Sequence, residues 1–168
     1  MRPESTLNPI SKLRTADELQ KIIVTAHSNG KSAVFANGCF DLIHVGHIRF
    51  LEGARAQGDL LVVAINSDAS VRLLKGAGRP LQPAVDRAEI LGSLECVDYT
   101  TIFDAPTVDS LLLQLRPDIQ AKGTDYSRET VPERGTVRAY GGAVAITGDC
   151  KAHSSRDMIQ AILEKFRS

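Results

Sequence analysis

The sequence predicts an α/β protein with a doubly wound, mostly parallel five-stranded sheet and helices on both faces. Short apolar segments alternate along the chain with segments whose apolar residues follow helical spacing. This alternation is typical of parallel strands joined by helices. One segment, residues 60–65, is apolar at every position, as expected for a strand that is buried on both faces.

Five short segments, most of them apolar, predict the strands of this sheet. They lie at residues 33–36, 60–65, 97–102, 119–122 and 143–146. Helical spacing of apolar residues predicts the helices around them. These lie at residues 15–29, from near 46 to 58, from 83 to 94, at 108–115, around 133–140 and at 158–166.

Local signals define the first helix and the longest loop. Thr15 and Glu18 have the spacing of a capping box, and Gly30 is placed to end the helix. The first helix is therefore expected at residues 15–29, after a loose extension over residues 1–12. Residues 76–83 are rich in glycine and proline and predict a mobile loop.

Composition limits the classes of function. The 20 basic and 20 acidic side chains give no formal net charge, so no overall field attracts nucleic acid or an anionic membrane. The amino terminus lacks an apolar signal segment, and no run approaches the length of a membrane span. The three scattered cysteines suit a reducing compartment. We therefore expect one cytoplasmic domain over residues 1–168 that binds neither nucleic acid nor a membrane.

Residues 37–47 predict a phosphate site. They lead from the first strand through Gly38 into a helix that begins near Gly46. Such a turn directs free backbone N–H groups and the positive end of the helix dipole at the space above the strand. His44 and His47 could both reach a phosphate there and stabilise its growing negative charge. The alternatives are a metal site or two ordinary surface histidines, although the sequence offers no third ligand at a suitable spacing.

Two motifs resemble the signatures of the cytidylyltransferase-like nucleotidyltransferases. The first is Gly-x-Phe-Asp at residues 38–41 followed by His-x-Gly-His at residues 44–47. The second is the start of a late helix, where Ser154 and Ser155 match and Arg156 replaces a third residue that usually carries a hydroxyl group. The resemblance implies a Rossmann-like fold and transfer of a nucleoside monophosphate from a nucleoside triphosphate to a phosphate. A guanidinium also binds phosphate, so Arg156 is compatible with that function.

Further motifs are similar to the adenylyltransferase module of bacterial heptose biosynthesis, and this resemblance covers residues 32–166. They are found at residues 66–70, 74–76, 79–80, 86–87 and 122–126. The resemblance implies that ATP donates AMP to D-glycero-β-D-manno-heptose 1-phosphate with the help of Mg²⁺, giving ADP-heptose for the lipopolysaccharide core. Many relatives carry the module behind a sugar kinase, so a separately encoded kinase in the same pathway is implied, and a homodimer is allowed.

The proposed site residues follow the predicted strands, where ligands bind in doubly wound sheets. The catalytic residues are expected to be His44, His47 and Lys75. The nucleotide-binding residues are expected to be Asn37, Gly38, Cys39, Phe40, Asp41, Gly46, Lys122, Gly123, Ser154, Ser155 and Arg156. The acceptor-binding residues are expected to be Asn66, Asp68, Arg79, Asp125 and Tyr126. No direct protein ligand to the metal is expected, because Mg²⁺ is mainly held by substrate phosphates.

Several of these residues have a plainer alternative. Residues 66–68 could form only a turn and a helix cap, since Ser and Asp are common capping residues. Lys75 and Arg79 could belong to a solvated basic face. The family resemblance implies that Arg87 is a structural or nucleotide-loop residue, and the alternative is that it only pairs with Glu95 or Asp98.

Two other function classes stay open. A cytidylyltransferase acting on glycerol 3-phosphate or another alcohol phosphate would share the His-x-Gly-His motif. It would be expected to carry an Arg-Thr-Glu-Gly-like segment where this chain has Asp-Cys-Lys-Ala at residues 149–152. A non-catalytic nucleotide-binding regulator would tolerate loss of His44 and His47, and both are present.

Overall fold

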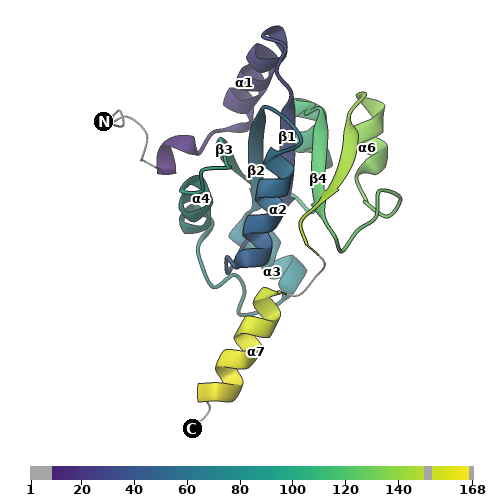
Figure 1. Cartoon of the computed structure of the whole chain (residues 1–168). Helices are drawn as coiled ribbons and strands as arrows, with labels where there is room; N and C mark the ends of the chain where they lie inside the picture. Colours follow the sequence, from purple (N-terminus) through teal and green to yellow (C-terminus); the bar gives the residue numbers. More distant parts are fainter. Residues whose placement is uncertain (1–8, 150–152, 167–168) are drawn as a thin grey trace.

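Five parallel strands form one sheet in the computed structural model, which describes residues 9–149 and 153–166 (Figure 1). The strands are β1 (Ala33–Gly38), β2 (Leu60–Asn66), β3 (Tyr99–Phe103), β4 (Ile119–Gly123) and β5 (Ala143–Thr147). Their spatial order is β3-β2-β1-β4-β5, and every neighbouring pair is parallel. The chain thus moves outward from β1 to one edge and then returns to fill the other side. The predicted doubly wound α/β fold is confirmed.

Seven α-helices and one 3₁₀ helix occur in the described residues. They are η1 (Pro9–Lys12), α1 (Ala16–Ser28), α2 (Val45–Arg55), α3 (Asp68–Lys75), α4 (Ala84–Gly92), α5 (Asp109–Leu115), α6 (Arg134–Ala139) and α7 (Ser155–Phe166). In this part of the chain no helix is both long and apolar enough to cross a membrane.

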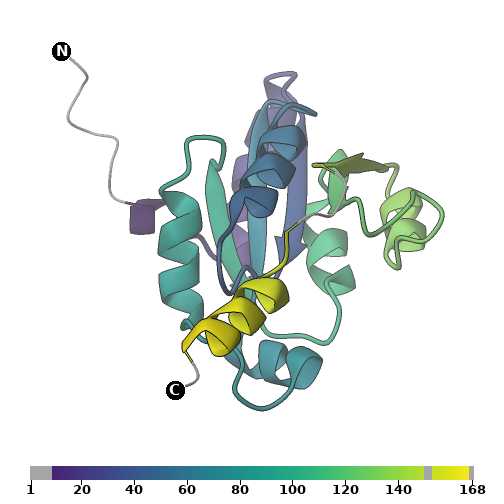
Figure 2. The same ribbon diagram turned by 60° about the horizontal axis from the view of Figure 1, so that its bottom comes forward.

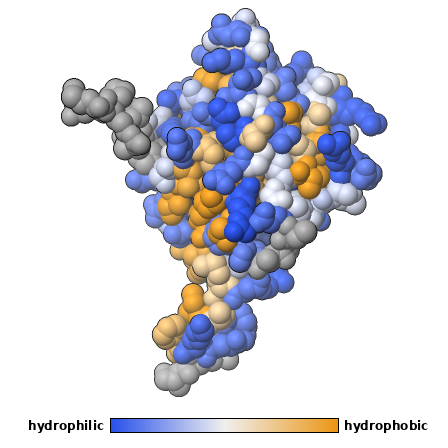
Figure 3. All heavy atoms as spheres, in the orientation of Figure 1, coloured by the Kyte–Doolittle hydropathy of each residue, from blue (hydrophilic) through white to orange (hydrophobic). Residues whose placement is uncertain are grey.

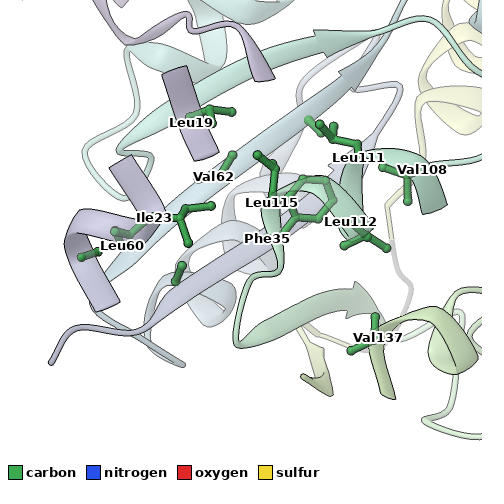
Figure 4. Close-up of a cluster of buried hydrophobic side chains, with 13 residues drawn as sticks. Leu19, Ile23, Phe35, Leu60, Val62, Val108, Leu111, Leu112, Leu115 and Val137 are labelled. Atoms are coloured by element: carbon green, nitrogen blue, oxygen red, sulfur yellow. The ribbon is translucent and has the colours of Figure 1, made fainter. Parts of the chain in front are cut away.

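The sheet separates two apolar cores. On one face Phe35 and Val62 pack with residues of α1 and α5, as Figure 4 shows. On the other face Val34 and Val63 pack with residues of α2 and α4. Alternate residues of β1 therefore enter opposite cores, which explains why the central strands are apolar at nearly every position.

Two predicted elements differ from the structure near the edge of the sheet. Residues 9–12 form η1 instead of a loose extension, because Lys12 Nζ donates to the backbone oxygens of Leu94 and Val97 at 3.1 and 2.6 Å. The third strand begins at Tyr99 instead of 97. The Val97 N–H bonds back to Leu94, and the Asp98 carboxylate accepts the Leu61 N–H at 2.7 Å. The remaining predicted extension, residues 1–8, lies outside the described residues.

The helix α3 was not predicted. The alternative for residues 66–68 is a turn and a helix cap, and the Ser67 hydroxyl does accept the Ser70 N–H at 3.0 Å. A full helix follows up to Lys75. Its two leucines, Leu73 and Leu74, are 84% and 55% exposed, and its buried residues are Ser70 and Val71, so Val71 is the one large apolar residue on its buried side.

The final helix covers neither face of the sheet. Figures 1 and 2 show α7 at the end of the sheet where the strands finish, close to α3 and pointing away from the body. None of its residues is buried. Its apolar residues Met158, Ile162, Leu163 and Phe166 are exposed and contribute to the orange surface in the lower part of Figure 3.

Candidate functional site

The loop between β1 and α2 is shaped by Phe40 and Asp41. Phe40 has a positive φ of 49°, and its buried ring lies 3.1 Å from the position that a Cβ atom on Gly38 would occupy. A side chain at position 38 would therefore crowd this ring, which is a physical reason for the glycine. The carboxylate of Asp41 is buried and accepts the Arg79 Nε–H at 2.5 Å and the backbone N–H groups of Leu81 and Gln82.

These donors decide the charge state of Asp41. Burial alone would raise the pKa of its carboxyl group, but the Leu81 and Gln82 N–H groups and the Arg79 guanidinium outweigh it and lower that pKa. Asp41 is thus an anion that fixes residues 79–82 against the loop after β1. The loop predicted at residues 76–83 is present and is held in place at this point.

His44 and His47 lie at the start of α2. His44 is the N-cap residue, and its backbone N–H donates to Nδ1 of His47 at 3.4 Å. The two rings stack with centroids 3.9 Å apart, and the ring of Phe40 lies 5.3 Å from that of His47. The Nδ1 atom of His44 is buried and has no hydrogen-bond partner among the described residues.

Both histidines are neutral at pH 7 in this structure. Burial lowers the pKa of His47 to about 4, and the neighbouring His44 contributes. Burial also lowers the pKa of His44, with a further contribution from His153. The pair therefore presents two neutral imidazoles that an anion can induce to bind a proton.

The end of β2 and the start of α3 are joined to the same loop by Arg87. This side chain is fully buried and donates to the backbone oxygens of Cys39 and Gln82 at 2.5 and 2.9 Å. It also pairs with Asp68 at 2.7 Å. The alternative in which Arg87 pairs with Glu95 or Asp98 is wrong, because its guanidinium faces the loop after β1. Asn66 donates to the Ser70 hydroxyl at 3.0 Å, within the same region.

The three predicted phosphate-binding cations have different surroundings. Arg79 is engaged by Asp41. Lys122 is buried between Asn37 and Glu133, with its Nζ 3.0 Å from Asn37 Oδ1 and 3.1 Å from Glu133 Oε1. Lys75 is exposed at the end of α3 and forms no ion pair with another described residue. Its positive charge acts on the Cys39 thiol, although burial dominates and raises the pKa of that thiol.

The start of α7 lies against the loop after β1. The Ser154 hydroxyl accepts the Asp157 N–H at 3.1 Å and caps the helix, while the Ser155 hydroxyl donates to the Leu42 oxygen at 3.0 Å. The ring of His153 is 6.5 Å from that of His44. The structure therefore brings the two predicted signatures together at the carboxyl ends of the strands.

A protein-family model described as cytidylyltransferase-like matches residues 35–160. The match contains both signatures and most of the sheet. The chain belongs to the cytidylyltransferase-like family. The predicted family is confirmed, and the chain is accordingly a nucleotidyltransferase.

Curated relatives show a more specific similarity than the family model does. Two proteins named Bifunctional protein HldE, from Syntrophotalea carbinolica and Citrifermentans bemidjiense, are 46% and 47% identical to this chain over 156 residues. The matched segment is 93% of this chain and 32% of each relative. This cytidylyltransferase-like chain thus spans about one third of the length of the relatives it matches.

Two solved structures have a fold similar to that of this chain. The lipopolysaccharide core biosynthesis protein from Thermoplasma volcanium is 26% identical and has a TM-score of 0.60, over 70% of this chain and 94% of that one. Pantothenate synthetase from Thermus thermophilus is 17% identical and has a TM-score of 0.63, over 88% of this chain and 67% of that one. The latter shows a shared fold alone.

Acidic side chains at this cytidylyltransferase-like site are already engaged. Asp41 is held by Arg79 and Asp68 by Arg87. Over residues 9–149 and 153–166, no three His, Cys, Asp or Glu side chains form a group that could hold a metal ion. The family generally uses a divalent metal ion. These surroundings fit an ion that arrives on the substrate phosphates and takes few protein ligands.

The structure adds two residues that sequence reasoning did not assign to the site. Glu133 compensates the charge of Lys122, and its Oε2 atom has no partner among the described residues. His153 stands next to the His44 ring. The position of His153 directly before Ser154 could have indicated it, whereas Glu133 precedes a helix of low apolar content and carries no comparable sequence signal.

The other predicted contact residues line the same edge of the sheet. Gly123 ends β4, and the Thr124 hydroxyl donates to the Asp149 oxygen at 2.6 Å, which joins the ends of β4 and β5. Asp125 and Tyr126 follow in the next turn, where Tyr126 is exposed and its ring centroid lies 5.6 Å from Lys122 Nζ. Arg156 is exposed in the first turn of α7.

Proposed function

We propose that this chain transfers AMP from ATP to D-glycero-β-D-manno-heptose 1-phosphate, releasing pyrophosphate and forming ADP-heptose for the lipopolysaccharide core. The observation that carries the proposal is the contact between the two signatures. It sets the stacked His44 and His47 beside the amino end of α7, joined by the bond from Ser155 to Leu42. The identity to Bifunctional protein HldE over 93% of the chain supports this choice of acceptor.

The reaction needs positioning more than proton transfer. A phosphate monoester is already an ionised nucleophile at pH 7, so no general base is required. Its oxygen attacks the α-phosphorus of ATP in line, the bond to the β-phosphate oxygen breaks, and pyrophosphate leaves without a covalent enzyme intermediate. The protein contributes by holding the two substrates in line and by stabilising charge on the phosphorus oxygens.

The histidine pair faces the charge that develops. His44 and His47 are neutral before substrate arrives, and the phosphates raise their proton affinity. Each ring can then donate a hydrogen bond to an α- or β-phosphate oxygen, and the donation strengthens as charge accumulates in the transition state.

Other residues bind the ends of the two substrates. Lys75, Arg156 and the hydroxyl-capped amino end of α7 contact the polyphosphate, since cations and helix amino ends bind phosphate. The backbone of residues 37–40, Gly46 and Gly123 gives the nucleotide close access to the sheet. Asn66, Lys122 and the exposed turn at residues 125–126 face the acceptor.

The ion pairs revise the predicted roles of Asp41, Asp68 and Arg79. Because Asp41 holds Arg79 and Arg87 holds Asp68, we assign these four side chains to the shape of the site. Mg²⁺ bound to the substrate phosphates would neutralise part of the negative charge of those phosphates. The supply of heptose 1-phosphate by a separate sugar kinase, and a homodimer, stay predictions.

Pyrophosphate release tests the proposal. The protein is incubated with each nucleoside triphosphate, Mg²⁺ and either heptose 1-phosphate or glycerol 3-phosphate. We expect the highest kcat/KM with ATP and the heptose. Faster turnover of CTP with glycerol 3-phosphate would assign the chain to the alcohol phosphate class, and nucleotide binding without pyrophosphate release would indicate a regulator.

A further inference from the structure

Three of the four histidines in the chain gather at one place. The rings of His44 and His47 stack, and the ring of His153 lies 6.5 Å from that of His44. The fourth, His27, lies at the end of α1 and pairs with Asp118 at 2.9 Å, at the opposite end of the sheet. The clustering comes from two segments that are distant in sequence, the start of α2 and the segment just before α7.

The backbone makes room for His153 over the first signature. A Cβ atom at position 46 would lie 3.5 Å from the Cβ of His153 and 3.0 Å from Nδ1 of His44. The first distance is an ordinary van der Waals contact and the second is a tight one, so a side chain at position 46 would crowd the His44 ring and touch His153. Gly46 therefore lies between the first signature and His153, and the two are in close proximity there.

His153 has no evident structural role among the described residues. Its side chain is exposed, and it forms no hydrogen bond or ion pair with another described residue. It precedes Ser154, which caps α7 without its help. An imidazole beside the predicted phosphate position is thus available to a ligand.

The groups that face the cluster are imidazoles, one carboxylate and one apolar ring, so a proton gained by an imidazole is what would make the cluster attract an anion. The titratable groups facing His44 are His47 on its own helix and His153 and Asp157 at the start of α7. His47 is faced by His44 and by the apolar ring of Phe40. A triphosphate adds several negative charges within a few ångströms, and such charges favour the protonated form of a neighbouring imidazole.

We infer that His153 is a third nucleotide-contacting histidine and that the three-histidine cluster takes up a proton when the polyphosphate of ATP binds. This inference rests on the proposed function for the identity of the nucleotide. The proton comes from the buffer and is shared by imidazoles that hydrogen bond to phosphate oxygens. The site in this chain thus contains three histidines, one more than the His-x-Gly-His motif supplies.

Calorimetry of ATP binding tests the inference without an acceptor. The full chain is titrated with ATP and Mg²⁺ at pH 7 in two buffers of different ionisation enthalpy, which gives both the Kd and the number of protons taken up. We expect uptake of about half a proton to one proton by the unchanged protein. His153→Asn should weaken binding about tenfold, the value of one charge-assisted hydrogen bond, and should reduce the proton uptake.

His27→Asn is the matched control, because it removes a histidine far from the site and should leave both quantities unchanged. His153→Gln serves as a second variant, and thermal unfolding checks that each variant folds. An unchanged Kd and an unchanged proton number in both His153 variants would overturn the inference, as would the absence of proton uptake in the unchanged protein. ATP binding without transfer to the heptose would instead defeat the proposed function alone.

Discussion

At the scale of single residues, His44 is the side chain on which the proposed chemistry depends most. His44 is the N-cap residue of α2, and its ring stacks on His47 and carries a buried nitrogen without a partner among the described residues. Loss of one donor to transition-state charge typically costs about 10² to 10³ in rate. We expect His44→Asn to lower kcat by that factor while the thermal unfolding temperature changes little.

Steady-state pyrophosphate release measures this prediction. Substitution of the distant His27 by Asn provides the matched control, with turnover expected to remain normal. A folded His44→Asn protein with near-normal kcat would refute the role of this ring in catalysis.

The buried pair of Lys122 and Glu133 is a second feature at this scale. Both side chains are about nine-tenths buried and 3.1 Å apart. Removing one charge from such a pair leaves the other uncompensated, so Glu133→Gln should reduce the free energy of unfolding by about 3 kcal/mol. Lys122→Met with Glu133→Leu should recover most of the loss, because an apolar pair replaces two buried charges.

Urea denaturation compares the three proteins. The double variant is also informative for function, since it should still fold but raise the KM for the acceptor. Equal stability of Glu133→Gln and the unchanged protein would show that the pair is not buried in solution.

Ion pairs of this kind could not be predicted from the sequence. Lys122 was expected to contact phosphate because it ends a buried strand, and Arg79 because it follows a glycine-rich segment. The structure gives each of them a carboxylate partner, Glu133 and Asp41, from another segment of the chain. Residue type and spacing predict the location of such charges, but the partner depends on how separate loops pack.

At the scale of elements, the loop after β1, the helix α3 and residues 79–82 form one unit held by Arg87. Its guanidinium bonds to Cys39, Gln82 and Asp68, one partner in each segment. We expect Arg87→Met to lower the free energy of unfolding by about 3 kcal/mol, because it leaves buried oxygens without donors. The same change should expose residues 76–83 to hydrogen exchange.

Amide hydrogen exchange read by mass spectrometry tests this link between elements. Arg72→Met, which removes an exposed arginine of α3, is the matched control and should leave exchange in residues 76–83 unchanged. Equal protection of that loop in the Arg87 variant would mean that Asp41 alone holds it.

The sequence predicts correctly those strands whose own residues form a buried apolar run. The strands β1 and β2 are apolar runs that enter two cores, so their sequence pattern alone indicates them. The sequence pattern does not predict the helix α3, because its two leucines face solvent. Contacts of Ser67 and Asp68 with other segments determine where this helix lies. Patterns that rely on a buried apolar side cannot detect such a helix.

At the scale of the whole molecule, the histidine cluster makes stability depend on pH. The pKa of His47 is lowered by burial to about 4 from an ordinary 6.5, so the unfolded chain binds more protons between these values. The stability is fully present above pH 6.5 and is lost as the pH falls toward 4. The loss should reach at most about 3.5 kcal/mol, since each pKa unit corresponds to about 1.4 kcal/mol.

Urea unfolding at several pH values from 4.5 to 7.5 measures this effect. Burial also lowers the pKa of His44, which acts in the same direction. The carboxyl groups whose pKa is lowered, such as those of Asp41 and Asp109 with an ordinary value of 3.8, lose their contribution only at lower pH. Glu18 and Glu129, whose pKa values are also lowered, have an ordinary value of 4.5, so the slope above about pH 5.5 is the part that reports the histidines. His47→Gln should flatten the dependence in that pH range, and a slope that survives this substitution would place the titrating group elsewhere in the molecule.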